Sequence, residues 1–182
     1  MLKTLYGIKS IKSLDKQDIL HLANKYNIPS IECYELDPAY LNYLNSLDTT
    51  NHKEQIKNHS QPLQALYYNK SGQMVSFHIN YYAGGFPNLN WNPNKIMQAF
   101  PPQTQAPLDS ILSVENLFNY LRPISSAVKI NNEKFDYLIF IYWNRFMGRQ
   151  SKRLIQTIQK NSELANPEKV RIIYINNDSI FF

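Results

Sequence analysis

The feature that most constrains the fold of this 182-residue chain is an apolar run, Tyr137–Trp143, that is followed by a helical pattern and a second apolar run. Seven consecutive hydrophobic residues are typical of a strand that is covered on both faces of a sheet. Residues 147–160 carry apolar side chains at helical spacing, and Val170–Ile175 again has the composition of a strand. We therefore predict two adjacent, parallel, central strands, with the intervening helix across one face of the sheet.

The first third of the chain predicts helices. Asp15 can cap a helix that reaches Tyr26, and Asp37-Pro38 can begin a second one. Between them, the residues around Cys33 predict a short buried strand. Residues 48–62 are polar and predict a loop with a weak helical turn.

A β-hairpin is predicted at 63–79, where two strand-like runs flank a turn that contains a glycine. The Pro- and Asn-rich segment 84–112 predicts a long irregular connection. Two domain organisations fit this pattern. Either the whole chain, 1–182, is a single domain, or a helical and hairpin region at 1–83 is joined to a core at 113–182.

Composition narrows the class of protein. With 43% hydrophobic and 18% charged residues the chain should fold around a core, and its single cysteine, Cys33, excludes an internal disulfide and a Cys-x-x-Cys site. No apolar run approaches the length of a membrane span, so we expect none. Met1–Gly7 lacks the apolar stretch of a signal peptide. We expect a cytoplasmic protein by default, and an extracytoplasmic one, periplasmic or a lipoprotein, if an export signal has been removed.

The segment from Tyr137 through Ser162 contains no acidic residue and has an excess of positive charge. The residues that could bind an anion near the helix start are Arg145, Arg149, Lys152 and Arg153. Free backbone N–H groups and the helix dipole also favour negative charge there. The alternative is a solvated helix face, with these cations paired to Asp136, Glu133 or Glu163.

Other candidate ligands and nucleophiles lack the partners that their chemistry needs. His52 and His59 lie in a polar segment without a nearby cysteine or pair of carboxylates, and His78 is expected to face solvent from its strand. Ser110 and Ser113 lack the Gly-x-Ser-x-Gly pattern of a hydrolase nucleophile. We therefore assign no catalytic residue, no metal site and no cofactor from the sequence.

The residues at 141–152, Ile-Tyr-Trp-Asn-Arg-Phe-Met-Gly-Arg-Gln-Ser-Lys, resemble the thioredoxin segment in which a central strand runs through F-W-A-x-W-C-G-P-C-K into the active-site helix. Trp143 and Phe146 match aromatic positions of that pattern, and Gly148 matches the glycine between its cysteines. The resemblance covers roughly residues 113–178. It implies an α/β fold with a thioredoxin-like βαβ core, an N-terminal helical region and a β-hairpin.

The chain departs from the thioredoxin pattern at the residues that carry its chemistry. Met147 and Gln150 stand at the two cysteine positions, in the motif Met-Gly-Arg-Gln, so the resemblance implies a redox-inactive protein. Cys33 is expected to be structural. The chain as given ends at Phe182, where a thioredoxin continues to a terminal hairpin, and we expect the earlier hairpin, 63–79, to take that place beside the central strand.

Three functions follow from these observations. The first is a non-enzymatic, thioredoxin-like binding or structural module of a bacterial-type protein. The second is an enzyme or binder that acts at the basic helix start, 145–153, on a small anion or an acidic protein. The third is nucleic-acid binding, which the sequence favours least because it contains no recognition-module motif.

Overall fold

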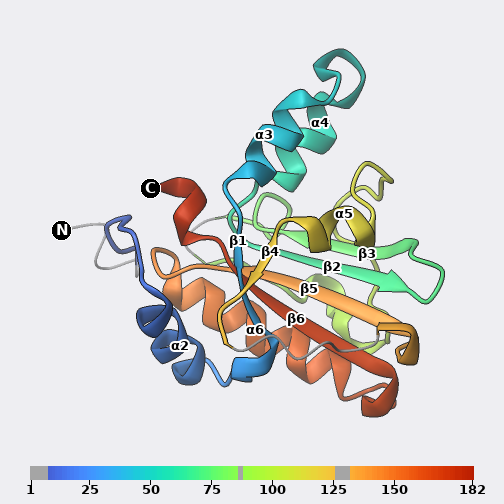
Figure 1. Ribbon diagram of the computed structural model, residues 1–182. Coiled ribbons are helices and arrows are strands. Elements are labelled where there is room, and N and C mark those ends of the chain that lie inside the picture. Colours follow the sequence, from blue (N-terminus) through green and yellow to red (C-terminus); the bar gives the residue numbers. More distant parts are fainter. Residues whose placement is uncertain (1–7, 86–87, 126–131) are drawn as a thin grey trace.

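The computed structural model describes residues 8–85, 88–125 and 132–182, and it is an α/β structure with one six-stranded mixed sheet (Figure 1). The strand order is β3-β2-β5-β6-β1-β4. The strands are β1 (Cys33–Leu36), β2 (Gln64–Asn69), β3 (Met74–Ile79), β4 (Leu121–Pro123), β5 (Tyr137–Trp143) and β6 (Val170–Asn176). Residues 1–7, on which the expectation about a signal peptide rests, lie outside the described residues.

Helices cover both faces of the sheet (Figure 1). They are α2 (Lys16–Lys25), α3 (Ala39–Ser46), α4 (Thr49–His59), α5 (Val114–Asn119) and α6 (Gly148–Ser162). Short 3-10 turns include η2 (Pro93–Gln98) and η5 (Asp178–Phe181). The predicted cap of the first helix is present, because the Asp15 carboxylate accepts a hydrogen bond of 2.7 Å from the backbone of Asp18. None of the described helices has the length and apolar character needed to cross a membrane.

The centre of the sheet is the predicted strand–helix–strand unit. β5 and β6 are adjacent and parallel, with Tyr137 opposite Val170 and Trp143 opposite Asn176. α6 connects them and packs against β5. β1 continues the parallel set beyond β6, and the hairpin β2–β3 lies antiparallel on the other side of β5. The predictions of two central parallel strands and of a hairpin beside them are therefore confirmed.

Side chains alternate between two hydrophobic cores, one on each face of the sheet. On β5, Ile139 and Ile141 enter the core that α2 and α6 cover. Leu138 and Phe140 enter the opposite core, which lies under α3, α5 and the segment that precedes α5. Because β5 is buried on both faces, its sequence is continuously apolar and does not alternate between apolar and polar residues.

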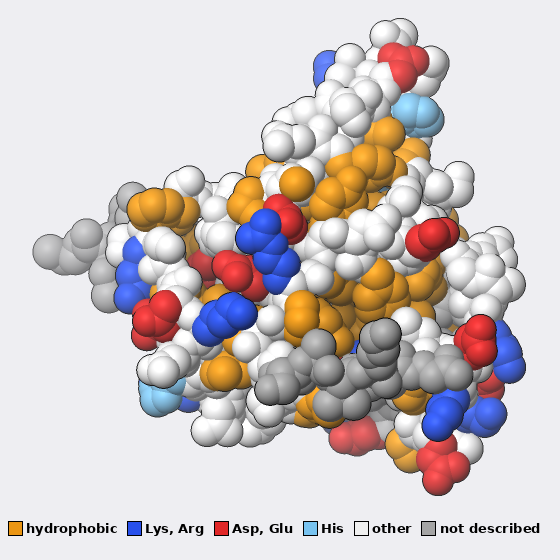
Figure 2. Space-filling model, in the orientation of Figure 1, with side chains coloured by type: hydrophobic (Ala, Val, Ile, Leu, Met, Phe, Trp, Pro, Cys, Tyr) orange, Lys and Arg blue, Asp and Glu red, His pale blue; other side chains and the backbone are white. Residues whose placement is uncertain are grey.

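The prediction of a loop at 48–62 is wrong, because this segment contains α4. Asp48 caps the helix by accepting a hydrogen bond from the backbone of Thr50 (2.9 Å), and Asn58 and His59 are buried at its end. Together α3 and α4 form an arm that projects from the body (Figure 1), and hydrophobic side chains extend along this arm towards α5 (Figure 2). Tertiary contacts at the base of the arm thus stabilise α4 as a helix although its sequence is polar.

Candidate functional site

The loop before α6 leaves the carboxyl end of β5 and lies beside the loop that leaves β6. In a parallel pair the carboxyl ends of both strands meet at one edge of the sheet, where ligand sites of α/β folds commonly lie. Here the backbone N–H of Asn177 donates to the carbonyl of Trp143 over 3.0 Å and joins the two strand ends. The start of α6, where the sequence predicts an anion site, therefore lies at this edge of the sheet, where a ligand site of an α/β fold is expected.

Asn144 is the hub of a buried polar network at this edge. Its side-chain N–H groups donate to the carbonyl of Pro62 (3.0 Å) and to the side-chain oxygen of Asn177 (3.1 Å). Its own side-chain oxygen accepts from the backbone of Met147 (2.9 Å). The hydroxyl of Ser151 bonds both to the backbone N–H and to the carbonyl of Asn144. The network fixes the loop to α6, to the end of β6 and to the residue before the hairpin.

The first turn of α6 is covered by α2. Met147 and Gln150, which stand at the cysteine positions of the thioredoxin pattern, are 9% and 2% exposed. Tyr26 packs its ring edge-on against Trp143, with 5.6 Å between ring centroids. A Cβ atom placed on Gly148 would lie 2.6 Å from the Tyr26 hydroxyl oxygen. The observed position of the Tyr26 side chain therefore leaves room only for a glycine at position 148. This part of the site is packed protein rather than a cleft.

Arg145 is held in the loop by contacts on two sides. Its backbone N–H donates to the Asp178 carboxylate over 2.7 Å, and Asn176 donates to the same carboxylate oxygen over 2.9 Å. Burial raises the pKa of Asp178 above its ordinary value, while these hydrogen bonds and the charge of Arg145 act in the opposite direction. The guanidinium of Arg145 donates to the carbonyl of Ser10 (2.8 Å). It is therefore engaged within the chain.

The other three candidate cations project from the exposed face of α6. Arg149, Lys152 and Arg153 are exposed, and their side chains form no ion pair or hydrogen bond with any residue in the described ranges. Asp136, one of the acids expected as a partner, instead lies 3.8 Å from the ammonium of Lys70. The structure thus places these three together on one helix and Arg145 apart from them.

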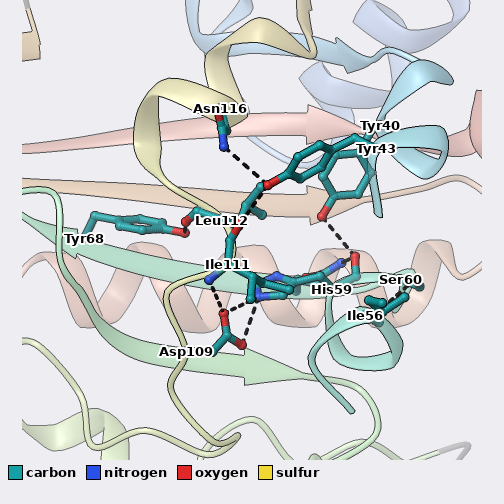
Figure 3. Close-up of polar contacts among 11 residues, drawn as sticks. Tyr40, Tyr43, Ile56, His59, Ser60, Tyr68, Asp109, Ile111, Leu112 and Asn116 are labelled. Carbon is teal, nitrogen blue, oxygen red and sulfur yellow. Dashed lines mark hydrogen bonds and ion pairs between the residues drawn. The ribbon is translucent and has the colours of Figure 1, made fainter. Parts of the chain in front are cut away.

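A second polar cluster joins α4 to the segment that precedes α5 (Figure 3). His59 is fully buried, and its Nε2 lies 3.0 and 3.1 Å from the two carboxylate oxygens of Asp109. The ring is stacked on Phe77, with 4.8 Å between centroids. The backbone N–H of Ile111 also donates to Asp109 (3.2 Å). This pair anchors the α3–α4 arm to the body.

Tyrosine hydroxyls complete the cluster. Tyr43 and Tyr68 donate to the backbone carbonyls of residues 111–112 over 2.8 and 2.7 Å, and Tyr40 donates to the carbonyl of His59 over 3.1 Å. Burial, with a smaller contribution from neighbouring groups, raises the pKa of Tyr40 and Tyr68 well above the ordinary value for tyrosine. At neutral pH both therefore remain neutral hydrogen-bond donors.

Asp109 also lines a cleft of about 500 Å³, which we call the Asp109 cleft. Its floor includes the buried side chains of Tyr68, Met74 and Leu112, and residues from the hairpin turn and from the segment before α5 form its rim. The volume is in the range of small-molecule sites. Ser110 and Ser113 line it as well.

The histidines occupy other environments than those predicted from the sequence. His59 has a carboxylate partner, which was not expected, because Asp109 is distant in the chain. The prediction that His78 faces solvent is wrong: it is fully buried on β3, and its Nε2 lies 2.8 Å from the hydroxyl of Ser76. Among the described residues, no group of three or more His, Cys, Asp or Glu side chains is placed to hold a metal ion.

Cys33 lies on β1 as predicted and is 1% exposed. Burial raises the pKa of its thiol to about 12, so the nucleophilic thiolate is scarce at neutral pH. The structure thus places the single thiol of the chain inside the core that α2 and α6 cover.

Comparison of the chain with models of protein families, with curated proteins and with solved structures gives no match.

Proposed function

We propose that this protein is a non-enzymatic binding or structural module, built on a rearranged thioredoxin-like sheet in which the hairpin precedes the βαβ core along the chain. The arrangement of β5, α6 and β6, with β2 and β3 antiparallel beside β5, supports the proposal. So does the resemblance of residues 141–152 to the thioredoxin segment.

One observation carries the redox-inactive part of the proposal. Met147 and Gln150 are buried, the backbone N–H of Met147 donates to Asn144, and neither side chain can form a thiolate. Disulfide exchange needs an accessible thiolate as attacking group. The elements that would present a reactive pair of cysteines in a thioredoxin serve here to join α6 to the sheet.

This proposal predicts that the protein does not reduce insulin disulfides in the presence of a dithiol reductant, because its one thiol is buried and its pKa is raised. The measurement is the rate of insulin precipitation above the rate with reductant alone. A thioredoxin serves as the positive control, and the Cys33→Ser variant as the matched negative control. Turnover by the wild-type protein that disappears in Cys33→Ser would contradict the proposal.

A second candidate function is the binding of an anion or an acidic protein on the basic face of α6. The observation that favours it is that Arg149, Lys152 and Arg153 are exposed and unpaired within the described ranges. Arginine offers planar, paired donors that suit carboxylate and phosphate groups. An unpaired basic face on a helix without acidic residues would attract such groups from solution.

For this second function we expect an acidic peptide or phosphate to bind the wild-type protein and to bind an Arg149→Ala/Arg153→Ala variant more weakly. Isothermal titration calorimetry measures both affinities, and Lys70→Ala is the matched control on another surface. A parallel titration with a short RNA, repeated at rising salt, tests the nucleic-acid alternative, because phosphate contacts make the affinity strongly salt-dependent. Equal, negligible heats for both proteins would show that the face is only solvated.

A further inference from the structure

The Asp109 cleft combines an apolar floor with a single charged group. Tyr68 and Leu112 are 1% and 2% exposed and Met74 is 5% exposed, so the floor is part of the hydrophobic core. Among the described residues that line the cleft, Asp109 is the only charged one. A concave apolar surface with one fixed polar group is the usual design of a small-molecule site.

The hydrogen bonds of Asp109 fix its carboxylate without using all of its capacity. Among the described residues, Oδ1 contacts Nε2 of His59 and accepts from the backbone of Ile111, whereas Oδ2 contacts His59 alone. An ionised carboxylate offers about four lone-pair sites, so Oδ2 can accept a further donor. The side chain of Asp109 is 9% exposed, and the residue is one of those that line the cleft.

The contacts of His59 fix the position of the Asp109 carboxylate. Nε2 of the ring faces both carboxylate oxygens of Asp109, at 3.0 and 3.1 Å. Nδ1 is buried and has no hydrogen-bond partner among the described residues. His59 thus holds the carboxylate of Asp109 in a fixed orientation.

We propose that the Asp109 cleft binds a small organic monocation, an ammonium group on an apolar body, with the ammonium on the carboxylate of Asp109 and the apolar body on Tyr68, Met74 and Leu112. The hydroxyls of Ser110 and Ser113 on the rim supply further acceptors. This site is distinct from the basic face of α6. It does not depend on the thioredoxin-like assignment.

The test compares three probes that share a 2-phenylethyl body by isothermal titration calorimetry at pH 7: 2-phenylethylammonium, 2-phenylethanol and 3-phenylpropanoate. We expect the ammonium to bind about tenfold or more tightly than the neutral alcohol, because a hydrogen bond to a charged group is stronger than one between neutral groups. The carboxylate probe should bind least. Amide NMR shifts should concentrate at residues 72–74 and 108–113.

Two sets of variants separate the charge of the cleft from its fold. Asp109→Asn should reduce the affinity for the ammonium about tenfold while the affinity for the alcohol changes little. Since Asp109→Asn also alters the contact with His59, a second pair acts at the exposed rim residue Leu108. Leu108→Lys should weaken ammonium binding and Leu108→Glu should strengthen it, each by about two- to fivefold.

Equal affinity for the ammonium and the alcohol would overturn the proposal. So would equal ammonium binding by both Leu108 variants, or shifts that lie away from the cleft. Absence of binding by all three probes in the millimolar range would overturn it as well. Urea unfolding of each variant establishes that the compared proteins are folded.

Discussion

At the scale of single residues, His78 shows how a buried ionisable group links folding to pH. It lies on β3 with its Nε2 on the hydroxyl of Ser76 and its ring edge-on to Tyr67, 5.9 Å between centroids. Burial is the main cause that lowers the pKa of His78, from 6.5 to about 4. The alternation along β3 was predicted correctly, but the segment after β3 covers the second face of the hairpin.

The lowered pKa of His78 predicts a loss of stability in acid. Below pH 6.5 the unfolded chain binds a proton at this residue that the folded chain binds only near pH 4, so stability falls as pH drops through this window. The contribution amounts to roughly 3 kcal/mol. Urea unfolding at pH 6.5 and pH 4 should therefore show a smaller loss for His78→Gln than for the wild-type protein. If both proteins lose the same free energy, His78 is not the group responsible.

At the scale of elements, the packing of α2 on α6 depends on one close approach. The Tyr26 hydroxyl occupies the space that a side chain at position 148 would need, while its ring lies on Trp143. Helix propensity gives glycine no advantage over alanine at this position. Its presence is explained by the packing of the two helices and not by local preference.

Gly148→Ala should therefore lower the free energy of unfolding by about 1–2 kcal/mol, because the added methyl group overpacks against the Tyr26 hydroxyl. In a Tyr26→Phe background the oxygen is absent, and the same substitution should cost markedly less. Urea titrations of the four proteins of this double-mutant cycle give the coupling, and Arg149→Ala at the neighbouring exposed position is the control. A cost of Gly148→Ala that is identical in both backgrounds would place the clash elsewhere.

At the scale of the whole molecule, the sequence predicted those parts of the sheet that local patterns encode. The run Tyr137–Trp143 and the strand after α6 predicted the parallel centre, and the turn at Gly72, whose φ is +75°, predicted the hairpin. Short strands such as β4 were missed, since three residues carry no measurable period. α4 was missed because its stability comes from contacts made far away in the sequence.

The candidate site was predicted only in part, for a related reason. Asn144 and Met147 follow a recognisable strand and could be located from the pattern. The pair His59 and Asp109 could not, because nothing local connects a polar segment with an irregular one that follows the hairpin. Only the folded sheet, which brings α4 and the segment before α5 to the same face, makes the pair visible.

The strand order has a consequence for how the chain is made. β1 needs β6 and β4 as neighbours, and the inner edge of β2 needs β5, so the strands that are synthesised first pair with strands that are synthesised last. At about 5–20 residues per second, the N-terminal half waits for seconds with unpaired strand edges and uncovered apolar side chains. A ribosome that carries this chain therefore displays an incomplete sheet until β5 and β6 have been synthesised.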